Sequence, residues 1–254
     1  MSISTNYLTE LARRIDWVRD TQADAIAAAA QVCADTIADD KLVLTFGTGH
    51  GGFAAAEMFP RTGTITGFRP INDTPITLMH HVWGDGGVHQ YRFLHSRPGY
   101  GNVILRANRA IDGDALLLFS HSGINNVILD MATEFKAKGR KVIGITSLPH
   151  SSQTPSRHES GKRLFEIADV VVDTGVPIQD ASQFIDGLPY PVGPTSTSIA
   201  IGIGHAIVSA TTEELVHRGR KPFVMVNTNT VSIEEAHIRN DENYEELWRL
   251  MKNR

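Results

Sequence analysis

Residues 41–61, KLVLTFGTGHGGFAAAEMFPR, constrain the fold more than any other stretch of this chain. An apolar run from Leu42 to Phe46 ends at a glycine-rich segment, residues 47–52, and an alanine-rich run follows. This order predicts a buried strand, a tight turn and a helix. Glycine lets a ligand approach the main chain, and the start of the helix offers unpaired N–H groups. The stretch therefore predicts an α/β fold in which a turn faces an anion.

Short apolar runs that alternate with helical periodicity continue along the chain, without a hairpin signal. This order favours a parallel sheet covered by helices on both faces. In such sheets ligands bind beyond the carboxyl ends of the strands. The expected strands are 42–46, 115–119, 142–146 and 168–172, with a weak one within 62–70; the expected helices lie at 5–38, 53–59, 102–110, 127–138, 195–218 and 243–252; the expected loops are 71–100, 149–163 and 177–194.

We expect one domain over residues 1–254, with an N-terminal helical segment of about 1–38 and a C-terminal helical tail of about 232–254. The formal net charge of −4 and the lack of a basic block argue against a nucleic-acid partner. The single cysteine, Cys33, excludes an internal disulfide. No signal peptide and no apolar run of about 20 residues is evident, so we expect no membrane partner and a cytoplasmic location.

Four histidines, His80, His81, His89 and His95, lie in the expected loop 71–100. Imidazole is a common metal ligand, but the spacing of these residues matches no known ligand pattern. Surface or substrate-facing histidines are the simpler interpretation. We therefore expect no metal site.

The pattern Gly47-x-Gly49-x-x-Gly52 also matches the dinucleotide-binding fingerprint. That interpretation requires a second good strand ending in Asp or Glu about 20 residues further on. Here the weak second strand ends in Phe68-Arg69-Pro70, without an acid. A nucleotide cofactor is therefore disfavoured, and we expect none.

A second turn, Ser120-His121-Ser122-Gly123-Ile124-Asn125, follows an apolar run and opens a helix. Its hydroxyls and amide can all donate to a tetrahedral oxyanion, together with backbone N–H groups. The alternative is ordinary helix capping, for which one such residue would suffice. Neither turn carries the Gly-Lys-Ser/Thr of a P-loop, so a phosphomonoester suits the site better than a nucleoside triphosphate.

Three segments together resemble sugar isomerase (SIS) domain proteins: Gly47-Thr48-Gly49-His50, the turn 120–125, and the helix start Pro194-Thr195-Ser196-Thr197. The resemblance covers roughly residues 5–220 and is nearest to the single-domain branch beside the phosphoheptose isomerases. It implies a three-layer αβα sandwich with a five-stranded parallel sheet. It also implies a homodimer or homotetramer with sites near subunit interfaces.

The resemblance also suggests a role for each matching residue. The acid–base pair would be Glu57 and His205, which can move protons between C1 and C2 and between the oxygens. The substrate-binding residues would be Ser120, Ser122 and Asn125 at the anion, Thr48, Gly49, His50 and Arg61 beside the first turn, and His121, Ser196 and Thr197 near the sugar.

Structural roles compete with several of these assignments. Glu57 and Arg61 stand at i,i+4 and could simply pair on a helix. His205 lies in an apolar helix and could be a buried structural residue, and His121 could point away from the site. Gly51 stands where the family usually has Ser, which removes one hydroxyl.

We therefore expect an aldose–ketose isomerase of an anionic sugar, most simply a sugar phosphate, that works by enediol proton transfer. The alternatives are a sulfosugar isomerase, an etherase or lyase on a phosphorylated amino sugar, and a non-catalytic sugar-phosphate sensor. The sensor would need a DNA-binding module, for which the first 40 residues are too short.

Overall fold

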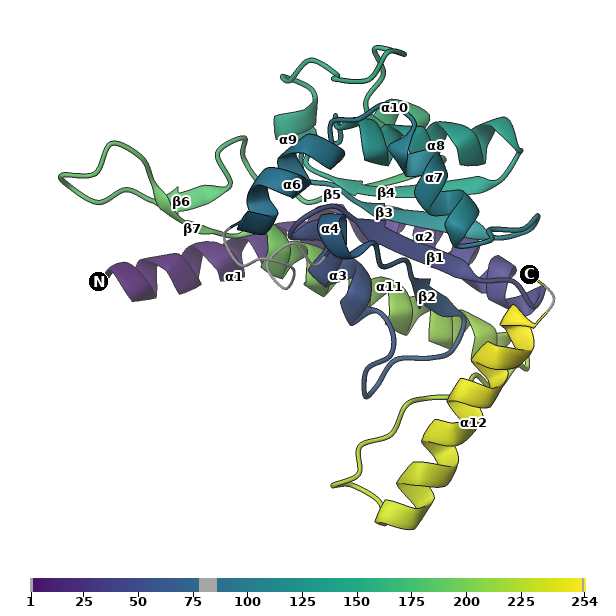
Figure 1. Ribbon diagram of the computed structural model, residues 1–254. Helices are drawn as coiled ribbons and strands as arrows, with labels where there is room; N and C mark the ends of the chain where they lie inside the picture. The colour runs from purple at the N-terminus through teal and green to yellow at the C-terminus, as the bar shows by residue number, and fades with distance from the viewer. Residues whose placement is uncertain (1, 78–85, 253) are drawn as a thin grey trace.

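A computed structural model describes residues 2–77, 86–252 and 254. Five strands form one parallel sheet in the order β2-β1-β3-β4-β5 (Figure 1). The strands are β1 (Val43–Gly47), β2 (Phe68–Pro70), β3 (Ala115–Phe119), β4 (Lys141–Thr146) and β5 (Val170–Asp173). This arrangement confirms the predicted five-stranded parallel sheet between helices.

Helices cover both faces of the sheet. Side chains alternate along each strand, so Val43 packs into one hydrophobic cluster while Leu44 and Phe46 pack into the other. Both clusters are buried, which explains why the strands read as continuous apolar runs. The first cluster lies under α2 (Ala23–Ala38), α3 (Gly51–Glu57) and α11 (Ser196–His217); the second lies under α7 (Tyr100–Ala107) and α8 (Asn126–Ala137).

Several elements fall where loops were expected. The expected loop 71–100 contains α4 (Thr74–Thr77) and α6 (Gly86–Leu94), and Tyr91 and Leu94 of α6 pack against the second cluster. Residues 149–163 begin within a short helix, α9 (Leu148–Ser151), and α10 (Leu164–Ile167) follows them. Residues 177–194 contain an antiparallel pair, β6 (Ala181–Gln183) with β7 (Val192–Pro194). These elements are three to nine residues long, too short for a clear periodic signal.

The last helix, α12 (Ile233–Met251), begins ten residues before the expected start at Asn243. Its signal was present in the sequence as Ser232-Ile-Glu-Glu235, because the Ser232 hydroxyl accepts a hydrogen bond of 3.1 Å from the Glu235 N–H.

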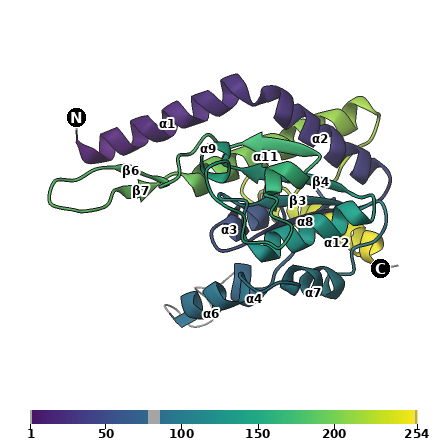
Figure 2. The same ribbon diagram turned by 90° about the horizontal axis from the view of Figure 1, so that it is seen from above.

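The first helix, α1 (Ile3–Thr21), projects from the body on the same side as the β6–β7 pair (Figures 1 and 2). The Tyr7 hydroxyl donates to the Pro194 carbonyl at 2.8 Å and joins the two elements. Because Pro194 directly precedes α11, this contact connects α1 to the region where α11 begins.

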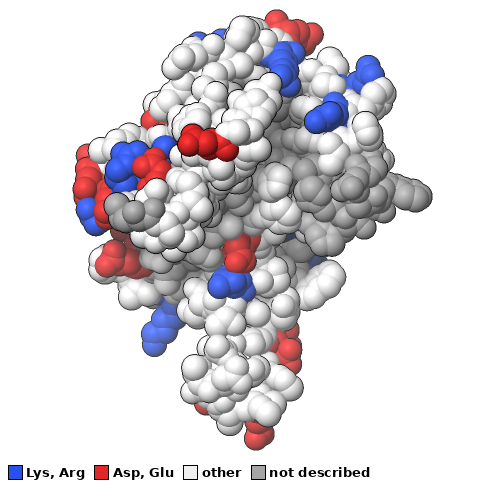
Figure 3. Space-filling model, turned by 90° about the vertical axis from the view of Figure 1, so that its left-hand side faces the viewer, with Lys and Arg blue, Asp and Glu red and all other residues white. Residues whose placement is uncertain are grey.

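Helix α11 is long and apolar enough, by length and composition alone, to cross a membrane. Its buried residues, including Ile199, Ile203 and Ile207, pack in the first cluster against the sheet. On the face shown in Figure 3, side chains of both charge signs are interspersed, and no broad positive area is seen there.

Candidate functional site

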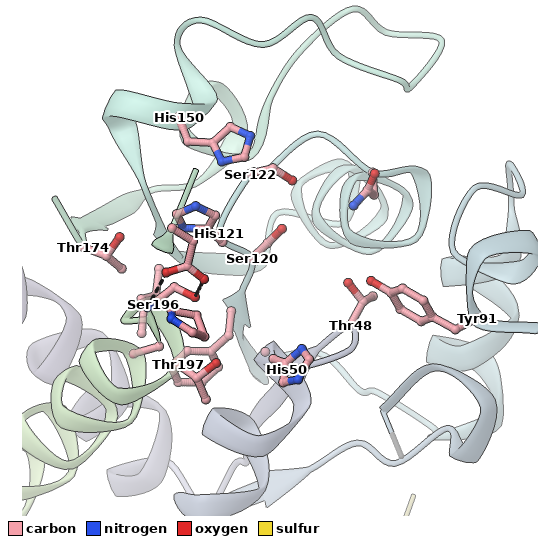
Figure 4. A pocket seen from close by; sticks show the side chains of 17 residues that line it. Thr48, His50, Tyr91, Ser120, His121, Ser122, His150, Thr174, Ser196 and Thr197 are labelled. Carbon is pink, nitrogen blue, oxygen red and sulfur yellow. Dashed lines mark hydrogen bonds between the residues drawn. The ribbon is translucent and has the colours of Figure 1, made fainter. Parts of the chain in front are cut away.

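A cavity of about 390 Å³ opens at the carboxyl ends of β1, β3 and β4, where a parallel sheet is expected to bind its ligand (Figure 4). Residues from the expected first turn, the expected second turn and the start of α11 meet there. The lining also includes Tyr91, His150, Thr174 and Asp180, which sequence reasoning did not single out.

The structure gathers most of the predicted site residues around this cavity. Those in the lining are Thr48, His50, Ser120, His121, Ser122, Asn125, Ser196 and Thr197. Gly49, Glu57, Arg61 and His205 are not in the lining.

The first turn needs its glycines for two separate reasons. Gly49 has a φ of 58°, in the left-handed region that favours glycine, and a Cβ there would lie 3.1 Å from the Tyr91 hydroxyl. A Cβ at Gly51 would lie 2.5 Å from the Phe119 carbonyl oxygen. The absence of Ser at position 51 therefore allows the turn to pack against the end of β3.

The second turn is fixed by hydrogen bonds to the end of β4. Ser120 N–H donates to the Ile145 carbonyl at 3.0 Å, and the His121 carbonyl accepts from the Ser147 N–H at 3.0 Å. The Ser120 hydroxyl accepts from the Gly123 N–H at 3.1 Å, so its own hydrogen remains available to donate. A donor from Ser120 thus faces the cavity from a rigid backbone.

Asn125 is the N-cap residue of α8, yet its side chain makes no capping hydrogen bond. Its Oδ1 instead accepts from the Arg157 guanidinium at 3.1 Å. Helix capping therefore does not explain the presence of Asn at position 125, and the N–H groups of its side-chain amide remain available to the cavity.

Two half-buried imidazoles, His121 and His150, form the inner wall of the cavity (Figure 4). Their ring centroids lie 4.7 Å apart, edge to face. Among the described residues, neither His121 ring nitrogen nor Nδ1 of His150 makes a hydrogen bond of good geometry, although the Pro177 carbonyl lies near enough to His121 to raise its pKa. Buried polar atoms are normally paired, so these nitrogens indicate a place for a hydroxyl-bearing ligand.

Burial sets the charge of this pair. It lowers the pKa of His121 to about 4, with a further lowering from His150 and an opposing effect from the Asp180 carboxylate. Burial also lowers the pKa of His150, again opposed by Asp180. His121 is therefore neutral at pH 7, and a neutral imidazole can both accept and donate a proton.

Asp180 organises the start of α11. Its Oδ1 accepts from the backbone N–H groups of Thr195 and Ser196 at 2.9 and 2.7 Å, and its Oδ2 accepts from the Ser196 hydroxyl at 2.6 Å. The Ser196 hydrogen is thereby used, so Ser196 can offer a ligand only acceptor lone pairs. This suits a sugar hydroxyl better than an anion.

The opposite wall is formed by Thr48 and Tyr91, whose hydroxyls point toward one another (Figure 4). Burial raises the pKa of the Tyr91 phenol, while Thr48 and Arg157 oppose that shift. His95 stacks on Tyr91 with centroids 4.6 Å apart, and its Nδ1 lies 2.9 Å from the Tyr91 carbonyl oxygen. His95 is therefore a buried support for Tyr91.

The predicted acid–base pair lies on two packed helices, α3 and α11, farther from the cavity than the residues that line it. Glu57 is seven residues beyond His50, about 10 Å along α3, and His205 is eight residues beyond Thr197, about 12 Å along α11. Glu57 pairs with Arg61 at 2.7 Å. A Cβ at Gly204 would lie 3.5 Å from the Met58 side chain. Met58 follows Glu57 and Gly204 precedes His205, so α3 and α11 pack together next to this pair.

No group of three or more His, Cys, Asp or Glu side chains that could hold a metal occurs among the described residues. Of the four histidines in 71–100, His89 is exposed and His95 is buried, while His80 and His81 lie outside the described residues. The residues missed from sequence left one indirect signal: His150 and Asp180 lie in long predicted loops, and such loops often carry function.

Comparison with known proteins agrees with this architecture. The SIS domain family matches residues 6–147. The chain is 34% identical over 236 residues to a UPF0309 protein of Shouchella clausii, covering 90% of this chain and 91% of that protein. It is 32% identical over 242 residues to a UPF0309 protein of Halalkalibacterium halodurans, covering 95% and 96%.

Solved structures show the same fold at low identity. The phosphoheptose isomerase of Neisseria gonorrhoeae superposes with a TM-score of 0.54 at 16% identity, covering 83% of this chain and 97% of that one. The phosphoheptose isomerase of Francisella tularensis gives 0.53 at 17%, covering 82% and 96%. The family match over more than half of the chain and the relatives above 30% identity show that the chain belongs to the SIS domain family.

Proposed function

We propose that this protein is an aldose–ketose isomerase of an anionic sugar, with a sugar phosphate as the expected substrate. The observation that carries the proposal is the cavity itself, which combines the hydroxyl and amide donors of the second turn with two half-buried imidazoles. The donors suit a tetrahedral anionic head, and the imidazoles suit the hydroxyl groups of a sugar. The phosphoheptose isomerases that share the fold support the same class of reaction.

In this proposal the anion is held by Ser120, Ser122 and Asn125. The sugar lies between the His121–His150 wall and the Thr48–Tyr91 wall, with Thr197 and the acceptor lone pairs of Ser196 at the start of α11. No cofactor is needed, because enediol chemistry only moves protons: one between C1 and C2, and one between O1 and O2. We keep the cytoplasm as the expected location.

Two assignments of the acid–base pair compete. Glu57 and His205 come from the family resemblance, and they lie outside the cavity lining of one chain. Their participation requires a second copy that brings them to the cavity of its neighbour, as in the expected homodimer or homotetramer. The Glu57 side chain, 34% exposed, is accessible for such a contact.

The second assignment is His121 and His150, which already lie in the cavity of the single chain. The observation that favours them is that both side chains line the cavity, with ring nitrogens that make no hydrogen bond of good geometry to the described residues. A neutral imidazole near C1 and C2 can remove a proton, and a second imidazole can return one to oxygen.

The experiment is solvent deuterium exchange at C2 of five- to seven-carbon aldose and ketose phosphates and of sulfonated sugars. Exchange by the wild type supports an isomerase; binding without exchange would identify a sensor instead. Loss of exchange in Glu57→Gln, with His150→Gln active, assigns the acid–base role to Glu57. The reverse result assigns it to the imidazole pair.

If no phosphosugar or sulfosugar exchanges, and Glu57→Gln leaves any activity unchanged, the isomerase proposal is wrong. A crystal soaked with substrate would locate the anion directly. An anion bound away from residues 120–125 would refute the assignment of the second turn.

A further inference from the structure

Arg157 lies against the second turn, although it is about 30 residues away in sequence. Its backbone N–H donates to the Ile124 carbonyl at 3.0 Å. Its guanidinium donates to Oδ1 of Asn125 at 3.1 Å. Both contacts fall on the second turn, and one of them is to Asn125, which we assign to the anion, so the segment after α9 is part of that region.

The residue after Arg157, His158, forms a buried pair that fixes the position of Arg157. Nε2 of His158 lies 3.3 Å from Oδ1 of Asp130 on α8, and the two side chains are only 8% and 5% exposed. The other carboxylate oxygen of Asp130 accepts from the Gly101 N–H at 3.1 Å. The backbone beside Arg157 is thus tied to α8, while the Arg157 side chain itself remains exposed.

The contact with Asn125 determines which end of that amide can meet a ligand. Oδ1 is occupied by the Arg157 guanidinium, and the side chain makes no capping bond to α8. The amide N–H groups are therefore left as donors for the cavity. A ligand that offers acceptors, such as an oxyanion, is favoured at this position.

An anion bound in this cavity also needs a positive charge nearby. The described lining contains no lysine or arginine, and its carboxylate, Asp180, repels an anion. Arg157 opposes the rise in the Tyr91 pKa, so its positive charge is felt at the opposite wall. A doubly charged head gains about twice as much as a singly charged head of the same shape from one nearby cation.

We propose that Arg157 is a positioning and specificity residue, which turns the Asn125 amide donors toward the anion and makes the site prefer a dianionic phosphomonoester over a monoanionic sulfate or sulfonate. This inference rests on the proposed function in one respect: the anionic head must bind at residues 120–125. It decides between the phosphosugar and sulfosugar alternatives in favour of the phosphosugar.

The test uses two small probes of the same shape, methyl phosphate and methyl sulfate, so that sugar specificity plays no part. At pH 8 methyl phosphate is a dianion, because its second pKa is about 6, and methyl sulfate is a monoanion. Dissociation constants are measured by ligand-observed NMR. For the wild type we expect methyl phosphate to bind about tenfold more tightly than methyl sulfate.

Three variants isolate the contribution of Arg157. Arg157→Gln removes the charge and should bring the preference close to one, while Arg157→Lys keeps the charge and should restore most of it. Arg239→Gln on α12, an exposed arginine paired with Glu242, is the control and should leave the preference unchanged. All variants keep the backbone bond to Ile124, and a general loss of structure would weaken both probes equally.

The outcomes separate the inference from the proposed function. An unchanged preference in Arg157→Gln, with methyl phosphate still bound, overturns the role of Arg157 alone. Equal weakening of both probes also overturns it. If the preference depends on Arg157 but no sugar phosphate exchanges deuterium at C2, the isomerase proposal fails and the inference stands. If the wild type binds neither probe, both are overturned.

Discussion

The Asp180 carboxylate accepts the Ser196 hydroxyl at 2.6 Å and, through its other oxygen, two backbone N–H groups at the start of α11. One loop residue thus accepts hydrogen bonds from backbone N–H groups at the start of a 22-residue helix and also lines the cavity. The orientation of the α11 hydroxyls is therefore coupled to the loop that precedes β6.

We expect Asp180→Asn to lower the free energy of unfolding by about 1–2 kcal/mol, because a neutral amide accepts more weakly from the three donors. Loss of the negative charge should also lower the pKa of His150, which Asp180 raises. Urea unfolding and NMR titration of the imidazoles measure the two effects. Asp186→Asn, an exposed residue in the following loop, is the control. Equal effects of both substitutions would contradict the capping role.

Asn125→Asp tests the second turn without disturbing the helix. Asp and Asn are equally good N-cap residues, so the stability of α8 should be retained. The new carboxylate would repel an anion at the same place, and we expect methyl phosphate binding to weaken by at least about tenfold. Asn229→Asp, in an exposed loop, is the matched control. Undiminished binding in Asn125→Asp would place the anion elsewhere.

Glu57→Gln should be a stable variant. The pair with Arg61 is an i,i+4 contact of 2.7 Å between side chains that are 34% and 52% exposed. Such pairs contribute little, so we expect a loss of less than about 0.5 kcal/mol in the free energy of unfolding. Urea unfolding measures it. A larger loss would show a structural role and would make reduced exchange in this variant ambiguous.

The central strands and the main helices could be predicted because their signals are local. Leu42 to Phe46 and Ala115 to Phe119 are apolar on both faces, and only a sheet covered on both sides requires that pattern. Ser232 with Glu235 carried an equally local signal for the start of α12, and it was missed.

Residues of the cavity could be predicted only where they directly follow a strand or open a helix. Ser120 and Asn125 meet this condition. His150 and Asp180 do not, because His150 lies inside the short helix α9 and Asp180 lies between β5 and β6. Arg157 reaches the second turn through tertiary contacts such as that between His158 and Asp130. Spacing in the sequence carries no trace of such contacts.

Two glycine substitutions should have opposite effects on stability. Gly51→Ala places a Cβ 2.5 Å from the Phe119 carbonyl oxygen, and we expect a loss of about 1–3 kcal/mol. Gly202→Ala on α11 meets nothing within 4 Å, and the better helix former should stabilise the protein by about 0.5–1 kcal/mol. Thermal and urea unfolding measure both. If Gly51→Ala is tolerated, the first turn does not pack on β3 as described.

His121 should make the ligand-free protein sensitive to acid. The unfolded chain takes up a proton on this residue below about pH 6.5, whereas burial holds the pKa in the folded protein at about 4. Between these values the unfolded state binds more protons, so the free energy of unfolding falls as the pH falls. From pH 7 to pH 5 the loss due to His121 is about 2 kcal/mol. Urea unfolding at the two pH values measures it, and His121→Asn should remove that part of the slope. His237→Asn, an exposed residue on α12, should leave the slope unchanged. A slope that is the same in all three proteins would show that His121 takes up its proton at the same pH in the folded and unfolded states, so that burial in the cavity wall does not hold it neutral as we propose.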